Sequence, residues 1–291
     1  MNICVKDIQI KTSVENGCET GCLEALIRAE AGQEVFLWAQ LLDSDGREAD
    51  RIFPVALEAE TSFRMEVPQV RLWNTEQPHL YDLVLELRDK DARLLGTTVK
   101  KAAFFLWKME NGVCWLNGRK MIPRVKEYAG EDVREIRRNN FNILLTDGAE
   151  EEEFRTLCLK CGIYGLPERQ WQADGGSMEN FCSGGTADPD IELQVVSRGI
   201  LIENRKIFSN TAQYSLHCSV YKDGDLLSEK TIQADTPPGT ALYLDFPLEE
   251  PGEPGEYVLE ASFCLKKDTP WAKSGYKITS ARCISSKLFS E

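Results

Sequence analysis

Short segments that alternate apolar and polar residues fill both ends of the chain, and this feature constrains the fold most. In the first hundred residues, Ser62 to Val67 and Tyr81 to Leu87 alternate with period two. This spacing turns one row of side chains toward a core and the other toward solvent. Asp43-Ser44-Asp45-Gly46 lies between two such segments and is a hairpin-turn signal. The pattern predicts an immunoglobulin-like β-sandwich over residues 1–110.

The same pattern returns near the end of the chain. Tyr214 to Tyr221 and Tyr257 to Leu265 are strand candidates, and Lys222 to Asp225 is a turn candidate. We therefore predict a second immunoglobulin-like β-sandwich over residues 191–291. Residues 171–190 are polar and glycine-rich, and they are interpreted as a linker.

Residues 111–170 carry a different pattern, in which short strand signals alternate with helix signals. Phe141 to Leu145 and Ile163 to Leu166 are typical of buried strands. Between them, apolar residues recur at the spacing of one helix face: Phe154, Leu157, Cys158 and Cys161. A strand–helix–strand–helix–strand order predicts parallel β/α units. The expected fold is mostly β: two immunoglobulin-like sandwiches joined by a small β/α layer.

The charge balance excludes several classes of partner. Lys and Arg number 34 against 47 Asp and Glu, a net charge of −13. Phosphate contacts need a basic surface, so nucleic-acid binding and an anionic membrane face are not expected. The chain has no apolar run of about 18 residues, which argues against a membrane span. Residues 1–7 do not read as the start of a secretory signal, so we expect a cytoplasmic protein.

Ten cysteines are spaced irregularly, and several lie inside apolar runs. We interpret them as reduced thiols that act as small hydrophobic residues. Cys18 with Cys22 and Cys158 with Cys161 could each supply half of a zinc site. The two pairs are far apart in sequence, and the chain has only two histidines. No metal and no other cofactor is therefore expected.

Four stretches resemble, in order along the chain, parts of glycoside hydrolase family 2, the β-galactosidase and β-glucuronidase group. Residues 70–87 resemble the end of its first immunoglobulin-like domain, through Leu-Trp, Pro and Leu-Tyr elements. Residues 112–119, with their Leu-Asn-Gly, are similar to the entry to its catalytic (β/α)8 barrel. Residues 140–168 are similar to the second strand, second helix and third strand of that barrel. Residues 199–208 resemble the start of its second immunoglobulin-like domain.

The resemblance implies a truncated TIM barrel and a pseudoenzyme. A complete barrel needs about 250 residues, far more than residues 111–170 provide. The acid/base and nucleophile glutamates of the family lie on later strands, for which there is no room, and its N-terminal sugar-binding domain is also lacking. The remaining portion departs from the family pattern, with Leu145 in place of an arginine and Gly148 in place of a nearby histidine.

One group of acids leaves an enzymatic hypothesis open. Glu127, Asp147 and Glu168 follow the three predicted parallel strands, and ligands bind at that edge in α/β folds. Two such carboxylates could act as acid and base, and Trp171 could stack on a sugar. The alternative interpretation of the same residues is solvated loop acids and a tryptophan that covers an apolar patch.

Three functional hypotheses follow. The first is a non-catalytic relative of β-galactosidases, a binding or assembly module whose partner is a glycan or a glycosidase polypeptide. The second is a residual glycosidase that hydrolyses O-glycosyl bonds with the acids named above, or that another chain completes. The third is an internally deleted gene product with a stable fold and no selected role. Three parallel strands leave two open edges, so a homo-oligomer that covers them is also expected.

Overall fold

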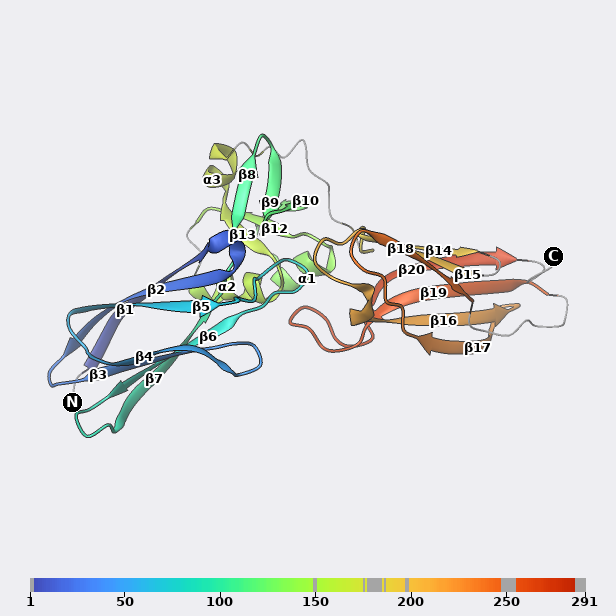
Figure 1. Cartoon of the computed structure of the whole chain (residues 1–291). Coiled ribbons are helices and arrows are strands. Elements are labelled where there is room, and N and C mark those ends of the chain that lie inside the picture. The colour runs from blue at the N-terminus through green and yellow to red at the C-terminus, as the bar shows by residue number, and fades with distance from the viewer. Residues whose placement is uncertain are drawn as a thin grey trace. The chain divides into compact units, whose positions relative to one another are not determined.

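The computed structural model divides into two compact units, each described by itself (Figure 1). Unit 1 comprises Met1–Met121, Glu151–Lys160 and Asp174–Gly176, and unit 2 comprises Ile122–Glu150, Cys161–Ala173 and Ser177–Glu291. The residues described are 3–148, 151–174, 176, 185, 187–196, 199–246 and 255–285. Among them, no helix is both long enough and apolar enough to span a membrane.

Unit 1 contains a β-sandwich of two antiparallel sheets. Over the described residues, their strand orders are β1-β2-β5 and β4-β3-β6-β7. The strands are β1 (Ile3–Glu15), β2 (Thr20–Ala31), β3 (Phe36–Leu42), β4 (Glu48–Ala56), β5 (Glu60–Pro68), β6 (Tyr81–Arg88) and β7 (Leu94–Ala102), and a 3-10 turn η1 (Asn16–Cys18) joins the first two. Period-two alternation buries Leu23, Leu83 and other inward side chains in one core between the sheets. This is the sandwich that the alternation predicts.

The β3–β4 hairpin closes at the predicted turn. Gly46 has φ of +76°, a backbone conformation that glycine adopts without a Cβ penalty. The carboxylate of Asp43 accepts hydrogen bonds from the backbone N–H groups of Asp45 and Arg47, at 2.8 and 2.9 Å. The turn residues therefore supply both the conformation and the hydrogen bonds that the chain reversal needs.

A small three-stranded sheet follows in unit 1, and Asn117-Gly118 forms one of its hairpin turns. Its strands are β8 (Trp107–Glu110), β9 (Val113–Leu116) and β10 (Arg119–Met121). Asn117 and Gly118 both have positive φ, 51° and 73°, as a type I′ hairpin turn requires. The Asn117 side chain also donates to the carbonyl of Trp73 at 2.9 Å. Trp73 is fully buried, and its indole N–H donates to the carbonyl of Leu159 in α2 (Glu152–Lys160) at 2.9 Å.

Unit 2 begins with a parallel sheet of order β11-β12-β13. Its elements are β11 (Val125–Glu127), α1 (Val133–Arg138), β12 (Ile143–Thr146), β13 (Tyr164–Pro167) and α3 (Glu168–Ala173). β12 pairs in parallel with both neighbours, and all four of its residues are buried. The Asp132 side chain caps α1 by accepting from the backbone N–H of Arg134. The parallel pairing agrees with the strand–helix–strand order of the sequence.

The second β-sandwich also lies in unit 2. Over the described residues, its sheets have the orders β14-β15-β18 and β17-β16-β19-β20. The elements are β14 (Ile191–Val196), β15 (Gly199–Asn204), η3 (Thr211–Gln213), β16 (Tyr214–Lys222), β17 (Asp225–Ile232), β18 (Thr240–Asp245), β19 (Tyr257–Leu265) and β20 (Lys277–Ser285). Its core includes Ile200, Leu216, Tyr257 and Phe263. The chain is therefore mostly β, as predicted.

The predicted linker, residues 171–190, lies partly outside the described residues. Its first three residues belong to α3, and two of its last three, Asp188 and Asp190, are held by ion pairs. Asp190 pairs with Arg124 at 2.8 Å, and Asp188 pairs with Lys206 at 2.7 Å. The end of this stretch is therefore anchored within unit 2 by charge as well as by backbone.

Candidate functional site

Three acidic residues reach the same edge of the parallel sheet. Glu127 is the last residue of β11, Asp147 directly follows β12, and Glu168 directly follows β13. The register pairs Glu127 with Leu145, and Thr146 with Pro167, so all three strands end at a similar level. Parallel strands present their carboxyl ends together, so the edge predicted from sequence is the one on which these acids lie.

The surroundings of these acids are open to solvent. Glu127, Asp147 and Glu168 are all exposed, and the side-chain amide of Gln172 donates to Glu168 at 2.8 Å. Enzymes stabilise developing charge best where water is excluded and the dielectric is low. Exposed carboxylates of this kind are hydrated and can contact a ligand.

The pKa of a fourth acid near this edge, Glu131, is lowered, whereas a general acid needs a raised pKa. Glu131 accepts a hydrogen bond from the Lys126 ammonium and another from the backbone N–H of Ala129, at 2.7 and 3.0 Å. These contacts lower the pKa of Glu131 to about 2, the Lys126 hydrogen bond being the largest cause. Glu131 is therefore ionised at neutral pH, whereas a general acid has to hold its proton there.

Trp171, the residue proposed to stack on a sugar, is 1% exposed. It lies on α3, which packs against β12 and β13. A sugar could reach the ring only if this packing opened. Stacking on Trp171 remains a prediction, and in this conformation the ring is part of the cover of the sheet.

The opposite edge of the sheet is a polar scaffold. The Asn142 side chain is buried; it accepts from the backbone N–H of Arg124 at 2.7 Å and donates to the carbonyl of Ile122 at 3.0 Å. The Arg124 guanidinium donates to the carbonyl of Asn140 at 2.7 Å. These groups satisfy one another, which is how buried polar groups are retained in a fold. Their role is to hold β11 and β12 in register.

The cysteines show no metal site in the part of the chain that the structure describes. No group of three or more His, Cys, Asp or Glu side chains there could hold a metal ion. Cys114 and Cys218 are buried, and burial raises the pKa of their thiols to about 11 and about 12. Thiols of this kind stay protonated at neutral pH and pack as small hydrophobic groups. Cys182 lies outside the described residues.

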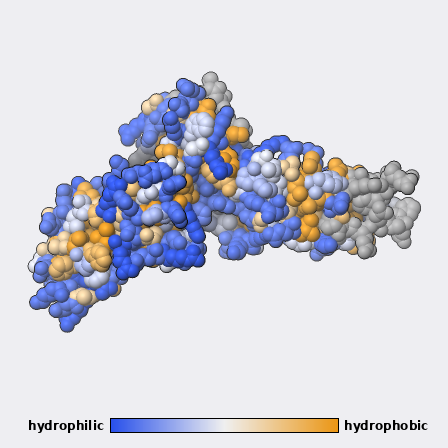
Figure 2. All heavy atoms as spheres, viewed as in Figure 1, coloured by the Kyte–Doolittle hydropathy of each residue, from blue (hydrophilic) through white to orange (hydrophobic). Residues whose placement is uncertain are grey.

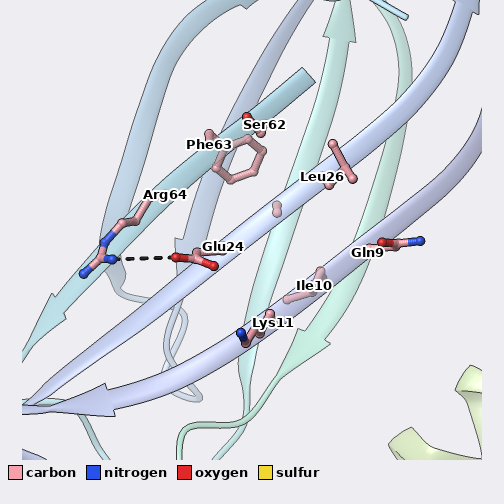
Figure 3. Close-up of a pocket in the computed structure, with 9 residues that line it drawn as sticks. Gln9, Ile10, Lys11, Glu24, Leu26, Ser62, Phe63 and Arg64 are labelled. Carbon is pink, nitrogen blue, oxygen red and sulfur yellow. Dashed lines mark ion pairs between the residues drawn. The ribbon is translucent and has the colours of Figure 1, made fainter. Parts of the chain in front are cut away.

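A pocket of about 640 Å³ lies on the face of sheet β1-β2-β5 (Figure 3). The register places Lys11 opposite Glu24, and Glu24 opposite Arg64, in a row of alternating charge. Arg64 lies 3.6 Å from Glu24, an ion pair that Figure 3 marks, and 3.1 Å from Glu15. These charges are compensated within the sheet, as in a solvated sheet face. Strand register, which the sequence does not specify, brings them together.

A second pocket lies on the outer face of sheet β4-β3-β6-β7 and contains aromatic side chains. Trp38 and Phe53 line it, and both are exposed. Neither residue was among the site residues predicted from the sequence. The period-two alternation of β3 could have indicated that Trp38 faces outward, because Trp38 lies between the buried residues Leu37 and Ala39.

The family model for glycosyl hydrolases family 2 matches residues 3–104, and the model for β-galactosidase domain 4 matches residues 200–284. A β-galactosidase of Halalkalibacterium halodurans is 25% identical over 192 residues, which are 60% of this chain and 19% of that protein. A β-galactosidase of Clostridium acetobutylicum is 32% identical over 89 residues, 31% of this chain and 10% of that protein. The chain thus spans less than a fifth of the length of these relatives.

Solved structures with similar folds were also found. A β-glucuronidase of Parabacteroides merdae has a TM-score of 0.48 and 16% identity, covering 57% of this chain and 23% of that one. A β-glucuronidase of Bifidobacterium dentium, complexed with coumarin-3-O-glucuronide, has a TM-score of 0.49 and 16% identity, covering 57% and 31%.

The two matched stretches coincide with the two sandwiches, so the class of protein is a multidomain chain built from glycosidase-type β-domains. Both sandwiches thus match domains of glycoside hydrolase family 2 enzymes, which the chain resembles over these two stretches. The resemblance read from the sequence is confirmed. Between the two matches lie residues 105–199, which include the whole parallel sheet.

Proposed function

We propose that this chain is a non-catalytic member of the family that acts by binding, as a carbohydrate- or protein-binding module. One observation carries the proposal: the interval between the two matched domains is residues 105–199, whereas a (β/α)8 barrel needs about 250 residues. In the described part of this interval, the parallel sheet has three strands. We interpret this sheet as the remnant of a truncated barrel.

The chemistry of glycoside hydrolysis supports the same proposal. A retaining glycosidase needs two carboxyl groups about 5 Å apart, one to protonate the leaving oxygen and one to attack the sugar. The acid needs a pKa raised by its surroundings. Glu127, Asp147 and Glu168 are exposed to solvent, whereas a catalytic pair works best where water is excluded. The two sandwiches, in contrast, offer extended sheet faces suited to contact.

A residual glycosidase is the second candidate, and one observation favours it. The three acids share the carboxyl edge of a parallel sheet, where α/β folds bind their ligands. In this alternative, the acids themselves or a second polypeptide that completes the site would hydrolyse an O-glycosyl bond.

Hydrolysis assays distinguish the two candidates. The full chain, expressed in a host that lacks its own β-galactosidase, is incubated with nitrophenyl β-galactoside, β-glucuronide, β-glucoside and β-mannoside. We expect release of nitrophenol at the rate of a heat-denatured sample. Turnover that is abolished by Glu168→Gln, Asp147→Asn or Glu127→Gln would show that the acids are catalytic and would overturn the proposal.

A further inference from the structure

The outer face of sheet β4-β3-β6-β7 carries large aromatic side chains in contact with solvent. In β3, Leu37 and Ala39 point into the core, and Trp38 between them is 38% exposed. Phe53 of β4 is 78% exposed. Figure 2 shows hydrophobic atoms reaching the surface over the N-terminal sandwich. Single exposed apolar residues are ordinary, but a cluster of them marks a contact surface.

A β-bulge brings the two aromatic residues together. Leu37 pairs with Val55 and Ala39 pairs with Ile52, so Trp38 alone faces Phe53 and Pro54. Bulges re-aim side chains and often lie beside functional sites. Pro54 has no N–H to donate, and it lies where that loss matters least, at a bulge in the edge strand β4. Local backbone structure thus directs Phe53 outward, beside Trp38.

The aromatic residues line a pocket of about 260 Å³. Val84 of β6 adds apolar surface, and Gln40, Arg51 and Arg88 provide polar groups. The volume lies just below the range of about 300–1,000 Å³ that is usual for small-molecule pockets, so the pocket holds at most one small ring system. The pocket thus combines an apolar floor with a few polar groups, as ligand sites do.

The polar groups beside the aromatic residues are already held in place. The Arg88 guanidinium lies 5.3 Å from the centre of the Trp38 ring and donates to Glu86 at 2.7 Å. On the other side, Glu48 accepts from Arg51 at 2.6 Å and from Gln40 at 2.9 Å. The two arginines balance the two glutamates, so the site carries no net charge.

We propose that this face binds a neutral saccharide. A pyranose ring has an apolar C–H face that packs on an aromatic ring, and hydroxyl groups at its edge that both donate and accept hydrogen bonds. Trp38 and Phe53 supply the aromatic surface, and the Arg88–Glu86 and Arg51–Glu48 pairs supply donors and acceptors on either side. An anionic ligand would gain from the arginines but would be repelled by the glutamates. The inference rests on the proposed function, that the chain acts by binding, and it names the ligand class and the location.

The other sheet of the same sandwich supports this assignment by contrast. Its outer face carries rows of compensated charge, with Arg28 paired to Asp7 at 3.4 Å and to Glu60 at 2.8 Å. In the pocket on this face, Leu26 of β2 lies between Gln9 of β1 and Ser62 of β5, so its apolar side chain has polar neighbours on both sides (Figure 3). Phe63 also lines this pocket, but it is partly buried against the core, whereas the exposed aromatic side chains Trp38 and Phe53 lie on the other sheet.

The test is a titration of the full chain with sugars, monitored by saturation-transfer NMR and calorimetry. The neutral sugars are lactose, cellobiose, xylobiose and mannobiose, and glucuronic acid is the charged control. We expect at least one neutral disaccharide to bind and glucuronic acid to bind more weakly. Trp38→Ala and Phe53→Ala should each weaken binding at least about tenfold. Because Phe53 is largely exposed, its variant should fold normally, which thermal melting checks.

Leu26→Ala on the opposite sheet is the matched control and should bind like the wild type. Absence of binding to every neutral sugar, or equal binding by the Trp38→Ala and Phe53→Ala variants, overturns the saccharide site. A concentration-dependent dimer in light scattering that Phe53→Ala abolishes would assign the face to a second copy of this chain, and also overturns it. These results are independent of the hydrolysis assay: turnover by the acids would refute the proposed function and leave a measured sugar site intact.

Discussion

Asp188 and Lys206 form an ion pair that is nearly removed from solvent, with side chains 9% and 4% exposed and 2.7 Å between Oδ2 and Nζ. Burial by itself raises the pKa of Asp188. The Lys206 charge and hydrogen bond, the backbone N–H of Asp190 and the charge of Arg137 outweigh burial, and the pKa lies below its usual value. The pair fixes Asp188 to the second sandwich, in a stretch where the sequence alone indicates a linker.

We predict that Asp188→Asn lowers the free energy of unfolding by about 3–5 kcal/mol at neutral pH, because it leaves the Lys206 charge buried without this partner. Because the pKa of Asp188 is lower in the folded state, the ion pair contributes fully to stability above the pKa of an unfolded aspartate, about 3.9. The contribution is lost as the pH falls through the pKa of Asp188 in the folded state. Urea denaturation at several pH values should therefore show the two proteins converging in acid. Glu203→Gln, at the exposed pair with Arg205, is the control and should cost about 1 kcal/mol or less. Equal stability of Asp188→Asn and wild type would contradict this prediction.

Within the strands, two glycines lie in opposite packing environments. Gly21 of β2 faces Phe104 and Val70: a Cβ there would lie 2.8 Å from an atom of each. Gly96 of β7 has no atom within 4 Å of the same position. Neither glycine has a positive φ, so the two positions differ in the room for a side chain and not in backbone conformation.

Gly21→Ala is expected to destabilise the first sandwich by about 1–3 kcal/mol, because the added methyl group displaces the Phe104 ring or Val70. Gly96→Ala is the matched control: it restricts the unfolded chain without a clash and should be neutral or stabilise by about 0.4–1 kcal/mol. Urea midpoints of the two variants measure the difference. Similar midpoints would show that the sheets adjust freely around β2.

At the scale of the whole molecule, the parallel sheet has two edge strands, β11 and β13. β11 and β13 each pair on one side with β12, over the described residues. Unpaired edges invite association, and we propose that a second copy of this chain, or a glycosidase polypeptide, covers them.

Hydrogen exchange and light scattering test this arrangement. Amides of β12 should exchange slowly, because the strand is buried and paired on both sides, and light scattering should report a mass above that of one chain. A monomer at every concentration, with rapid exchange throughout residues 120–170, would contradict a packed layer whose edges are covered.

The sequence by itself determined the local features of this protein. Period-two alternation and turns such as Asp43 to Gly46 and Asn117-Gly118 indicate strands and hairpins because they act within a few residues. The order of strand and helix signals was enough to place Glu127, Asp147 and Glu168 at one sheet edge, since parallel strands end together. Collinear stretches were enough to indicate the resemblance to the family, which the domain matches confirm.

Only the tertiary structure decided what depends on partners distant in sequence. The bulge that sets Phe53 beside Trp38 follows from the pairing of β3 with β4, which no local pattern encodes. The ion pair of Asp188 with Lys206 requires two segments to meet, and the burial of Trp171 requires α3 to pack on the sheet. Strand register and burial depend on many weak contacts between residues that are distant in sequence. A sequence pattern reflects only the interactions between residues that are close in sequence.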